Sequence, residues 1–204
     1  DFDRIADDDR IDAVHLCLPV GLHAEYATRA LQAGKHVLCE KPLAHDAASA
    51  RRLIALAKHS GRVLMPAYLH GARTSLSVGL AAALQRLPEL GPLCAIDAHK
   101  GFAMALPPDN WRFDPALSGG GSLFDIGPYS LQLTRWLAGA MPVRVQAFQA
   151  PGGGDTRFAK VEPHTGWLME FSSGLIATGS SSWRYRLQNH ATVAGSQAWM
   201  RLDP

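Results

Sequence analysis

Short apolar runs alternate with amphipathic stretches through the first third of the chain. Two helix-like segments, 22–33 and 46–59, carry apolar residues on one face, and each is followed by a glycine, Gly34 or Gly61, at the place of a left-handed C-cap. Around them lie three runs typical of strands buried on both faces of a parallel sheet: 13–19, 35–39 and 62–67. This alternation predicts right-handed crossovers and a parallel, doubly wound sheet.

The pattern changes after Tyr68. A helix over about 74–87, a strand over 93–101 and a proline-containing loop precede a glycine run at 119–121, and an amphipathic helix is expected over 122–138. Short turns join the remaining strand-like stretches, which favours a mostly antiparallel sheet. These stretches cover 143–150, 164–172, 175–183 and 191–202.

The two patterns predict two domains in an α/β chain. Residues 1–67 form part of a parallel-sheet domain, and residues 68–204 form an α+β domain with an open, mostly antiparallel sheet. The chain begins at Asp1 inside a charged segment and stops at Pro204 just after a strand-like run. We therefore interpret it as a fragment truncated at both ends, with the second domain incomplete.

Charge and cysteine content narrow the classes of partner. The 20 Lys and Arg against 18 Asp and Glu are scattered rather than gathered in a stripe, which predicts a small-molecule partner and no nucleic-acid or membrane surface. The sequence contains no run of 18 or more apolar residues, so no membrane span is predicted. Cys17, Cys39 and Cys94 are odd in number and lack C-x-x-C spacing, which favours a reducing, cytoplasmic compartment. A periplasmic location stays open, because the true N-terminus is missing in this interpretation.

The tripeptide Glu40-Lys41-Pro42 directly follows the second predicted strand. Ligands of open α/β sheets bind outside the carboxyl ends of the strands, so both charged side chains are candidates for a site. The alternative is a surface ion pair ahead of a helix. His23, at the start of the first helix, suits either a phosphate or ribose contact or a role in capping or in the core, and the residues alone favour the second. The other histidines show no metal-ligand spacing, so no metal is expected.

The segment 118–129 is the strongest constellation. Asp125 and Tyr129 are four residues apart, which places them on one face of a continuous helix. A capping box with Ser122 as N-cap would explain Asp125 without catalysis. The pair Gly127-Pro128 fits poorly in a second helical turn, so it indicates either a functional irregularity or a helix that starts later. A serine hydrolase built on Ser122 is disfavoured, because G-x-S-x-G is absent.

The stretches HLCLPVGLHAEYATRALQAGKHVLCEKPLA and DNWRFDPALSGGGSLFDIGPYSLQLTRWLAG together resemble the glucose-fructose oxidoreductase and inositol dehydrogenase family of NAD(P)-dependent dehydrogenases. The resemblance covers nearly the whole chain in order. It implies a Rossmann domain followed by an α/β domain with an open, largely antiparallel sheet, which agrees with the periodicity. It also implies a homo-oligomer in the intact protein.

The resemblance implies roles for the site residues. Glu40 and Lys41 would line the nicotinamide ribose, with Lys41 also contacting the substrate hydroxyl, and Asp125 would orient the substrate. Tyr129 stands where many members have a histidine and would be the acid/base; the pKa of free tyrosine is about 10, and Lys41 would lower that of Tyr129. Other residues would contact the cofactor: Leu18, Val20 and His23 at its border, Trp111 and Arg112 closing over it. The Lys41-Pro42 peptide would be cis.

Two segments depart from the family pattern: Leu18-Pro19-Val20 and Tyr68-Leu69-His70-Gly71. The family's first strand, G-x-G-x-x-G turn and ribose-reading acidic residue would lie upstream of Asp1, so the expected cofactor is NAD or NADP. We expect a dehydrogenase or reductase of a sugar, polyol or cyclic diol, with the chain as given inactive and weak in cofactor binding. The alternative is a catalytically silent member that binds a sugar-like ligand or a partner protein through its open sheet.

Overall fold

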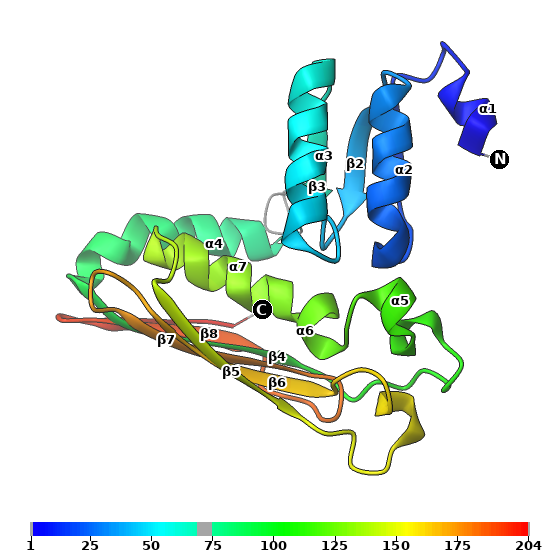
Figure 1. The fold of residues 1–204 in the computed structure, drawn as a ribbon. Coiled ribbons are helices and arrows are strands. Elements are labelled where there is room, and N and C mark those ends of the chain that lie inside the picture. The colour runs from blue at the N-terminus through cyan, green and yellow to red at the C-terminus, as the bar shows by residue number, and fades with distance from the viewer. Residues whose placement is uncertain (1, 69–74, 204) are drawn as a thin grey trace. The chain divides into compact units, whose positions relative to one another are not determined.

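The computed structural model describes residues 2–68 and 75–203, and their contacts divide the chain into two compact units (Figure 1). The first unit runs to Tyr68 and also includes Asp114–Gly119, and the second consists of Leu69–Phe113 and Gly120–Pro204. Among the described residues, no helix is both long and apolar enough to cross a membrane.

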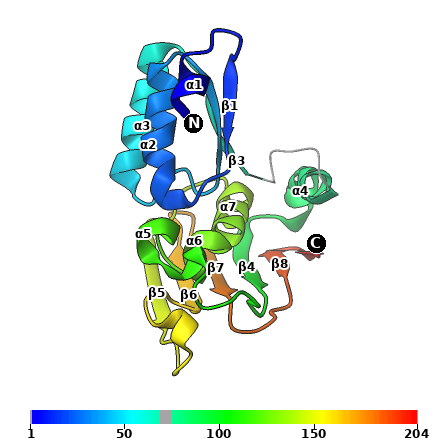
Figure 2. The same ribbon diagram turned by 90° about the vertical axis from the view of Figure 1, so that its right-hand side faces the viewer.

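The first unit is built on a three-stranded parallel sheet in the order β1-β2-β3, which confirms the predicted parallel sheet. Both crossover helices pack side by side on one face of it (Figure 2), as two right-handed crossovers in the same direction require. The elements are α1 (Phe2–Ala6), β1 (Ala13–Leu16), α2 (Val20–Gln32), β2 (His36–Glu40), α3 (Ala47–Ser60), β3 (Leu64–Ala67) and, from the later segment, α5 (Pro115–Ser118).

Local sequence signals set the ends of these helices. Gly34 follows α2 with φ 73° and Gly61 ends α3 with φ 64°, so both glycines adopt the predicted left-handed conformation. At the start of α3, the Asp46 carboxylate accepts a 2.7 Å hydrogen bond from Ser49 N. The core between helices and sheet consists of Leu16, Ala27, Ala30, Leu31, Val37, Cys39, Leu53 and Ala57.

The second unit contains a six-stranded sheet in the order β5-β6-β7-β4-β8-β9. Every neighbouring pair is antiparallel except β4 and β7, so the predicted mostly antiparallel sheet is confirmed. Helix α7 packs on one face, against β4 and β7 (Figure 1). The elements are α4 (Ser75–Arg86), η2 (Leu87–Leu90), β4 (Leu93–Gly101), η3 (Trp111–Phe113), α6 (Ser122–Asp125), α7 (Gly127–Ala138), β5 (Arg144–Ala150), η4 (Thr156–Phe158), β6 (His164–Glu170), β7 (Ile176–Ser182), β8 (His190–Gly195) and β9 (Trp199–Leu202).

Two expected elements differ in the structure. The helix expected over 122–138 is two helices, because the backbone turns at Ile126 and α7 starts afresh at Gly127. Pro128 then lies in the first turn of α7, where its missing N–H costs nothing. The strand expected over 191–202 is a hairpin of β8 and β9, closed by the hydrogen bond from Gly195 N to Ala198 O. Residues 69–71 of the second departing segment, and Thr74 at the expected helix start, lie outside the described residues.

Candidate functional site

The carboxyl ends of β1 and β2 lie at the same edge of the parallel sheet. Leu16 is paired with Cys39, so Leu18 and Val20 after β1 and Glu40-Lys41 at the end of β2 emerge together. Helix α2 begins at Val20, and Pro19 at its N-cap makes no side-chain cap hydrogen bond. This edge therefore offers two charged side chains beside a helix N-terminus without a side-chain cap, a combination suited to a polar or anionic ligand.

The peptide between Lys41 and Pro42 is cis, as predicted. Both residues are half-buried, and the Glu40 carboxylate accepts a 3.3 Å hydrogen bond from Lys41 N. On its other oxygen, Glu40 lies 3.8 Å from His15 Nε2. The carboxylate is thus held against the backbone of the same turn that presents the ammonium.

His23 connects the two strand ends. Its side chain is buried, with 1% of the residue exposed, and its ring nitrogens lie 2.9 Å from Pro42 O and 2.8 Å from Leu18 O. Both nitrogens face backbone carbonyl oxygens, which accept from a ring N–H, and this agrees with the core role that the residues alone favour. His23 can border a cofactor only through its ring carbons, and its clear effect is to fix the turn that carries Lys41.

In the second unit, the N-terminus of α6 is capped by Glu162, which the sequence interpretation missed. Its carboxylate accepts 2.8 Å hydrogen bonds from Gly121 N and Leu123 N, and its carbonyl oxygen accepts one of 3.0 Å from Ser122 N. The capping box on Ser122 is therefore wrong: Gly121 is the N-cap residue, and the buried Ser122 hydroxyl lies 3.1 Å from Ser181 Oγ. A Cβ at Gly121 would collide with the Glu162 carbonyl, which explains a glycine there.

Asp125 and Tyr129 belong to different helices, so the prediction that they share the face of one continuous helix is wrong. Asp125 is the last residue of α6, and its Oδ2 accepts a 3.2 Å hydrogen bond from Nε1 of Trp183, which is 1% exposed. Tyr129 lies in the first turn of α7, half-buried. It packs against the apolar cluster of Met104, Phe113, Ile126, Phe158, Val161 and Trp183. The Asp125 carboxylate is thus held by an indole, and Tyr129 packs on one side against apolar side chains.

Lys100 supplies a cation to Tyr129 within this unit. Its Nζ lies 4.5 Å from the centroid of the Tyr129 ring. The sequence interpretation considered only Lys41 as the ammonium for this phenol. The missed signal was the alternation along β4, where Ile96 and Ala98 are buried and Lys100 continues the same side.

Trp111 and Arg112 form η3, and both are half-buried. The Arg112 guanidinium lies 4.5 Å from the centroid of the Trp111 ring, and its backbone N donates to Asn110 Oδ1 at 3.1 Å. The two side chains are therefore stacked on each other as a planar, cationic surface. Their closure over a cofactor stays a prediction.

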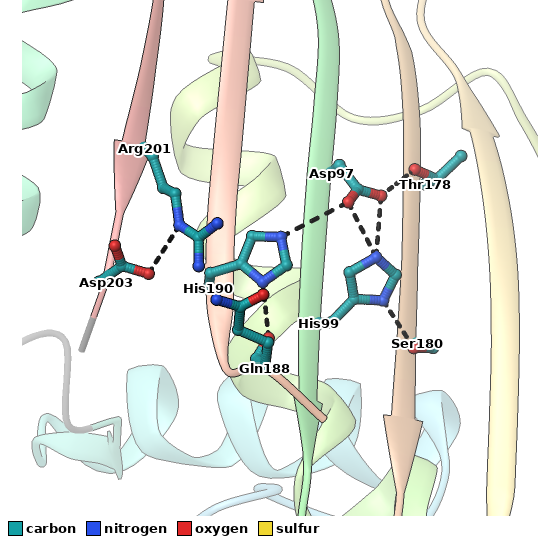
Figure 3. A network of polar contacts seen from close by, with 8 residues as sticks. All are labelled: Asp97, His99, Thr178, Ser180, Gln188, His190, Arg201 and Asp203. Carbon is teal, nitrogen blue, oxygen red and sulfur yellow. Dashed lines mark hydrogen bonds and ion pairs between the residues drawn. The ribbon is translucent and has the colours of Figure 1, made fainter. Parts of the chain in front are cut away.

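A second cluster of polar side chains lies on the face of the six-stranded sheet opposite α7 (Figure 3). His99 Nδ1 lies 2.7 Å from Ser180 Oγ, and His99 Nε2 lies 2.9 Å from Asp97 Oδ2, an order reminiscent of a serine hydrolase. Ser180 is 7% exposed and lies in β7, whose backbone pairs with strands on both sides. The backbone N–H groups near Ser180 therefore bond to neighbouring strands and do not form an oxyanion hole, which argues against a hydrolase site. His190 Nε2 adds a 3.8 Å contact to Asp97. Across the described residues, no group of three histidine, cysteine or acidic side chains is arranged to hold a metal.

Parallel βα units with charged residues at the carboxyl ends of the strands are typical of dinucleotide-binding domains. Family models agree. Residues 1–68 match the model described as "Oxidoreductase family, NAD-binding Rossmann fold", and residues 81–201 match "GFO/IDH/MocA C-terminal domain". The second match alone covers more than half of the chain, and the chain belongs to the GFO/IDH/MocA family.

Several proteins similar to this chain are named as sugar oxidoreductases. The chain is 33% identical to D-xylose 1-dehydrogenase (NADP(+)) 2 of Haloferax volcanii, over 100% of this chain and 62% of that protein. It is 39% identical to dTDP-3,4-didehydro-2,6-dideoxy-alpha-D-glucose 3-reductase of Streptomyces violaceoruber, over 99% of this chain and 57% of that protein. The crystal structure of aldose-aldose oxidoreductase from Caulobacter crescentus complexed with glycerol matches with a TM-score of 0.90 and 37% identity, over 100% of this chain and 59% of that one. The chain thus spans about three fifths of the length of these relatives.

Proposed function

We propose that the whole protein is an NAD(P)-dependent oxidoreductase that transfers a hydride between a nicotinamide cofactor and a hydroxyl or carbonyl carbon of a sugar, polyol or cyclic diol. The observation that carries the proposal is Glu40-Lys41-Pro42 at the carboxyl end of a parallel strand, in a chain of the GFO/IDH/MocA family. The sugar-active relatives support the substrate class.

The residues of the first unit fit the nicotinamide end of such a cofactor. The helix N-terminus at Val20 has no side-chain cap, and Glu40 and Lys41 offer an acceptor and a cation at the same strand edge. Leu18 and Val20 would border the cofactor through apolar and backbone contacts, and Trp111 with Arg112 would cover it. When bound, the nicotinamide supplies the carbon that accepts or gives the hydride.

The remaining chemistry belongs to the chain's own side chains. The Lys41 ammonium donates a hydrogen bond to the substrate oxygen, and Asp125, held by Trp183, accepts one from a neighbouring hydroxyl and fixes the pose. Tyr129 Oη takes the hydroxyl proton during oxidation and returns it during reduction. Much of the rate then comes from the orientation of these groups.

The test uses the full-length protein with NAD or NADP and a panel of aldoses, polyols and cyclic diols, followed by the absorbance of reduced nicotinamide. We expect Tyr129→Phe to lower kcat by about 10²–10⁴-fold with cofactor affinity nearly unchanged. Tyr185→Phe is the matched control, because Tyr185 is exposed and bonds to His164 on the open sheet. Cofactor binding without turnover on any of these substrates would favour the catalytically silent alternative.

We also propose that the intact protein is a homo-oligomer through the open face of its sheet. Phe148 and Trp199 are 80% and 67% exposed on β5 and β9, and the strand register places them on the same face as Leu168 and Ile176. These exposed apolar side chains flank the polar cluster of Asp97 and His99 on the same face, and such a patch suits a two-fold pairing with a second copy. Light scattering on Phe148→Asp should report a smaller species than the wild type.

The three unpaired cysteines support a cytoplasmic location.

A further inference from the structure

We propose that Lys100 is a positioning residue of the acid/base step: its ammonium, held over the Tyr129 ring, favours the phenolate form of this tyrosine. The inference deepens the proposed function and rests on it for its catalytic meaning. The contact that carries it, 4.5 Å from Lys100 Nζ to the ring centroid, lies wholly within the second unit.

The fold places Lys100 on this ring by strand alternation. Lys100 occupies the side of β4 that faces α7, where the preceding residues Ile96 and Ala98 are each 1% exposed. A lysine on the apolar side of a sheet loses part of the hydration of its ammonium group, and this loss is unfavourable unless the ammonium reaches a partner. The face of an aromatic ring is such a partner, because its negative quadrupole attracts a cation.

The same contact acts more strongly on the ionised phenol. Loss of the hydroxyl proton puts a full negative charge on the oxygen and the ring, and a cation within about 4–6 Å favours the ionised form by about 1–3 pH units. Tyr129 is half-buried and packs against an apolar cluster, so water screens the attraction only in part. Lys100 therefore prepares the base before the substrate arrives.

Other charged groups on the surrounding elements have their own contacts. Arg157 of η4 is paired with Asp155 at 2.7 Å, and Arg112 of η3 stacks over Trp111. Asp125 of α6 accepts a hydrogen bond from the buried Trp183 indole.

The experiment titrates the phenol directly in the full-length protein. Each protein is compared with the same protein carrying Tyr129→Phe in addition. The ultraviolet absorbance of phenolate is measured against pH for both, and the difference between the two curves is the titration of Tyr129. The proteins are wild type, Lys100→Met, Lys100→Gln, Lys100→Arg and Lys160→Met. Lys160 is exposed in the same unit and controls for the loss of one positive charge. Lys41 is intact throughout, and circular dichroism checks that each variant is folded.

We expect the midpoint of Tyr129 to rise by about one pH unit or more in Lys100→Met and Lys100→Gln, and to stay near the wild-type value in Lys100→Arg and Lys160→Met. The pH profile of kcat/KM should move by the same amount, with little change in the KM for cofactor. An unchanged midpoint in both neutral variants overturns the proposal, as does an equal rise in Lys160→Met. Because the titration needs no turnover, it gives its answer even if no sugar is a substrate and the proposed function fails.

Discussion

The Glu162 cap permits a quantitative test of how the second unit holds Asp125. Glu162→Ala removes the acceptors of two 2.8 Å hydrogen bonds, from Gly121 N and Leu123 N. Hydrogen bonds to charged groups contribute about 1.5–3 kcal/mol each and an N-cap about 0.5–2 kcal/mol, and these overlap because both describe the same contacts. We expect a loss of about 2–4 kcal/mol in the free energy of unfolding, and about half of it for Glu162→Gln, which keeps one acceptor oxygen.

Urea unfolding of the full-length variants measures this loss. With m of about 1–3 kcal/mol/M, the midpoint should fall by about 1–2 M in Glu162→Ala. Since the two units need not unfold together, amide hydrogen exchange at residues 121–123 reports the cap locally. Glu170→Ala is the control, because its contact to Arg144 at 3.4 Å is a surface ion pair worth about 0–1 kcal/mol. The reasoning would be refuted if Glu162→Ala were as stable as Glu170→Ala and amide hydrogen exchange at residues 121–123 stayed slow.

Three further outcomes are expected. Burial raises the pKa of the Cys39 thiol to about 12, so at neutral pH iodoacetamide should modify both exposed cysteines and reach Cys39 only after unfolding, as read by peptide mass spectrometry. Hydrogen bonds from the Ser49 side chain and N–H hold the pKa of Asp46 below its usual 3.8. The stabilisation by this cap is therefore complete above about pH 4 and lost as the pH falls, so the thermal stability of Asp46→Asn should trail wild type at neutral pH and converge with it in acid. Gly21→Ala should cost about 1–3 kcal/mol in thermal unfolding, because the new methyl would collide with the Ala116 carbonyl on α5.

The sequence predicted those features of the fold that depend on local pattern. The parallel strands and the helix ends at Gly34 and Gly61 follow from apolar periodicity and from backbone freedom at glycine, and both are confirmed. The unbroken strand expected over 191–202 was wrong, because the chain turns between Gly195 and Ala198. The pair Gly195-Ser196 between two apolar stretches is a local hairpin signal that the apolar periodicity alone does not include.

The candidate site was less accessible to such reasoning. Lys41, Asp125 and Tyr129 were named from position and resemblance, but the groups that hold them are distant in sequence. Glu162 caps a helix some forty residues earlier, and Trp183 reaches Asp125 from the end of another strand. No local pattern encodes these contacts, since the tertiary fold alone brings their partners together.

The strand order of the second unit has a consequence for folding during synthesis on the ribosome. Strand β4 lies between β7 and β8, and both of these neighbours are later in the chain. During synthesis from the N-terminus, β4 therefore leaves the ribosome long before any strand exists to pair with it. Such long-range pairing slows folding, because the intervening loop must close before any contact compensates for it. The apolar side of β4 therefore lacks both neighbouring strands until the polypeptide has grown past Ser182, and lacks one of them until it has grown past Gly195.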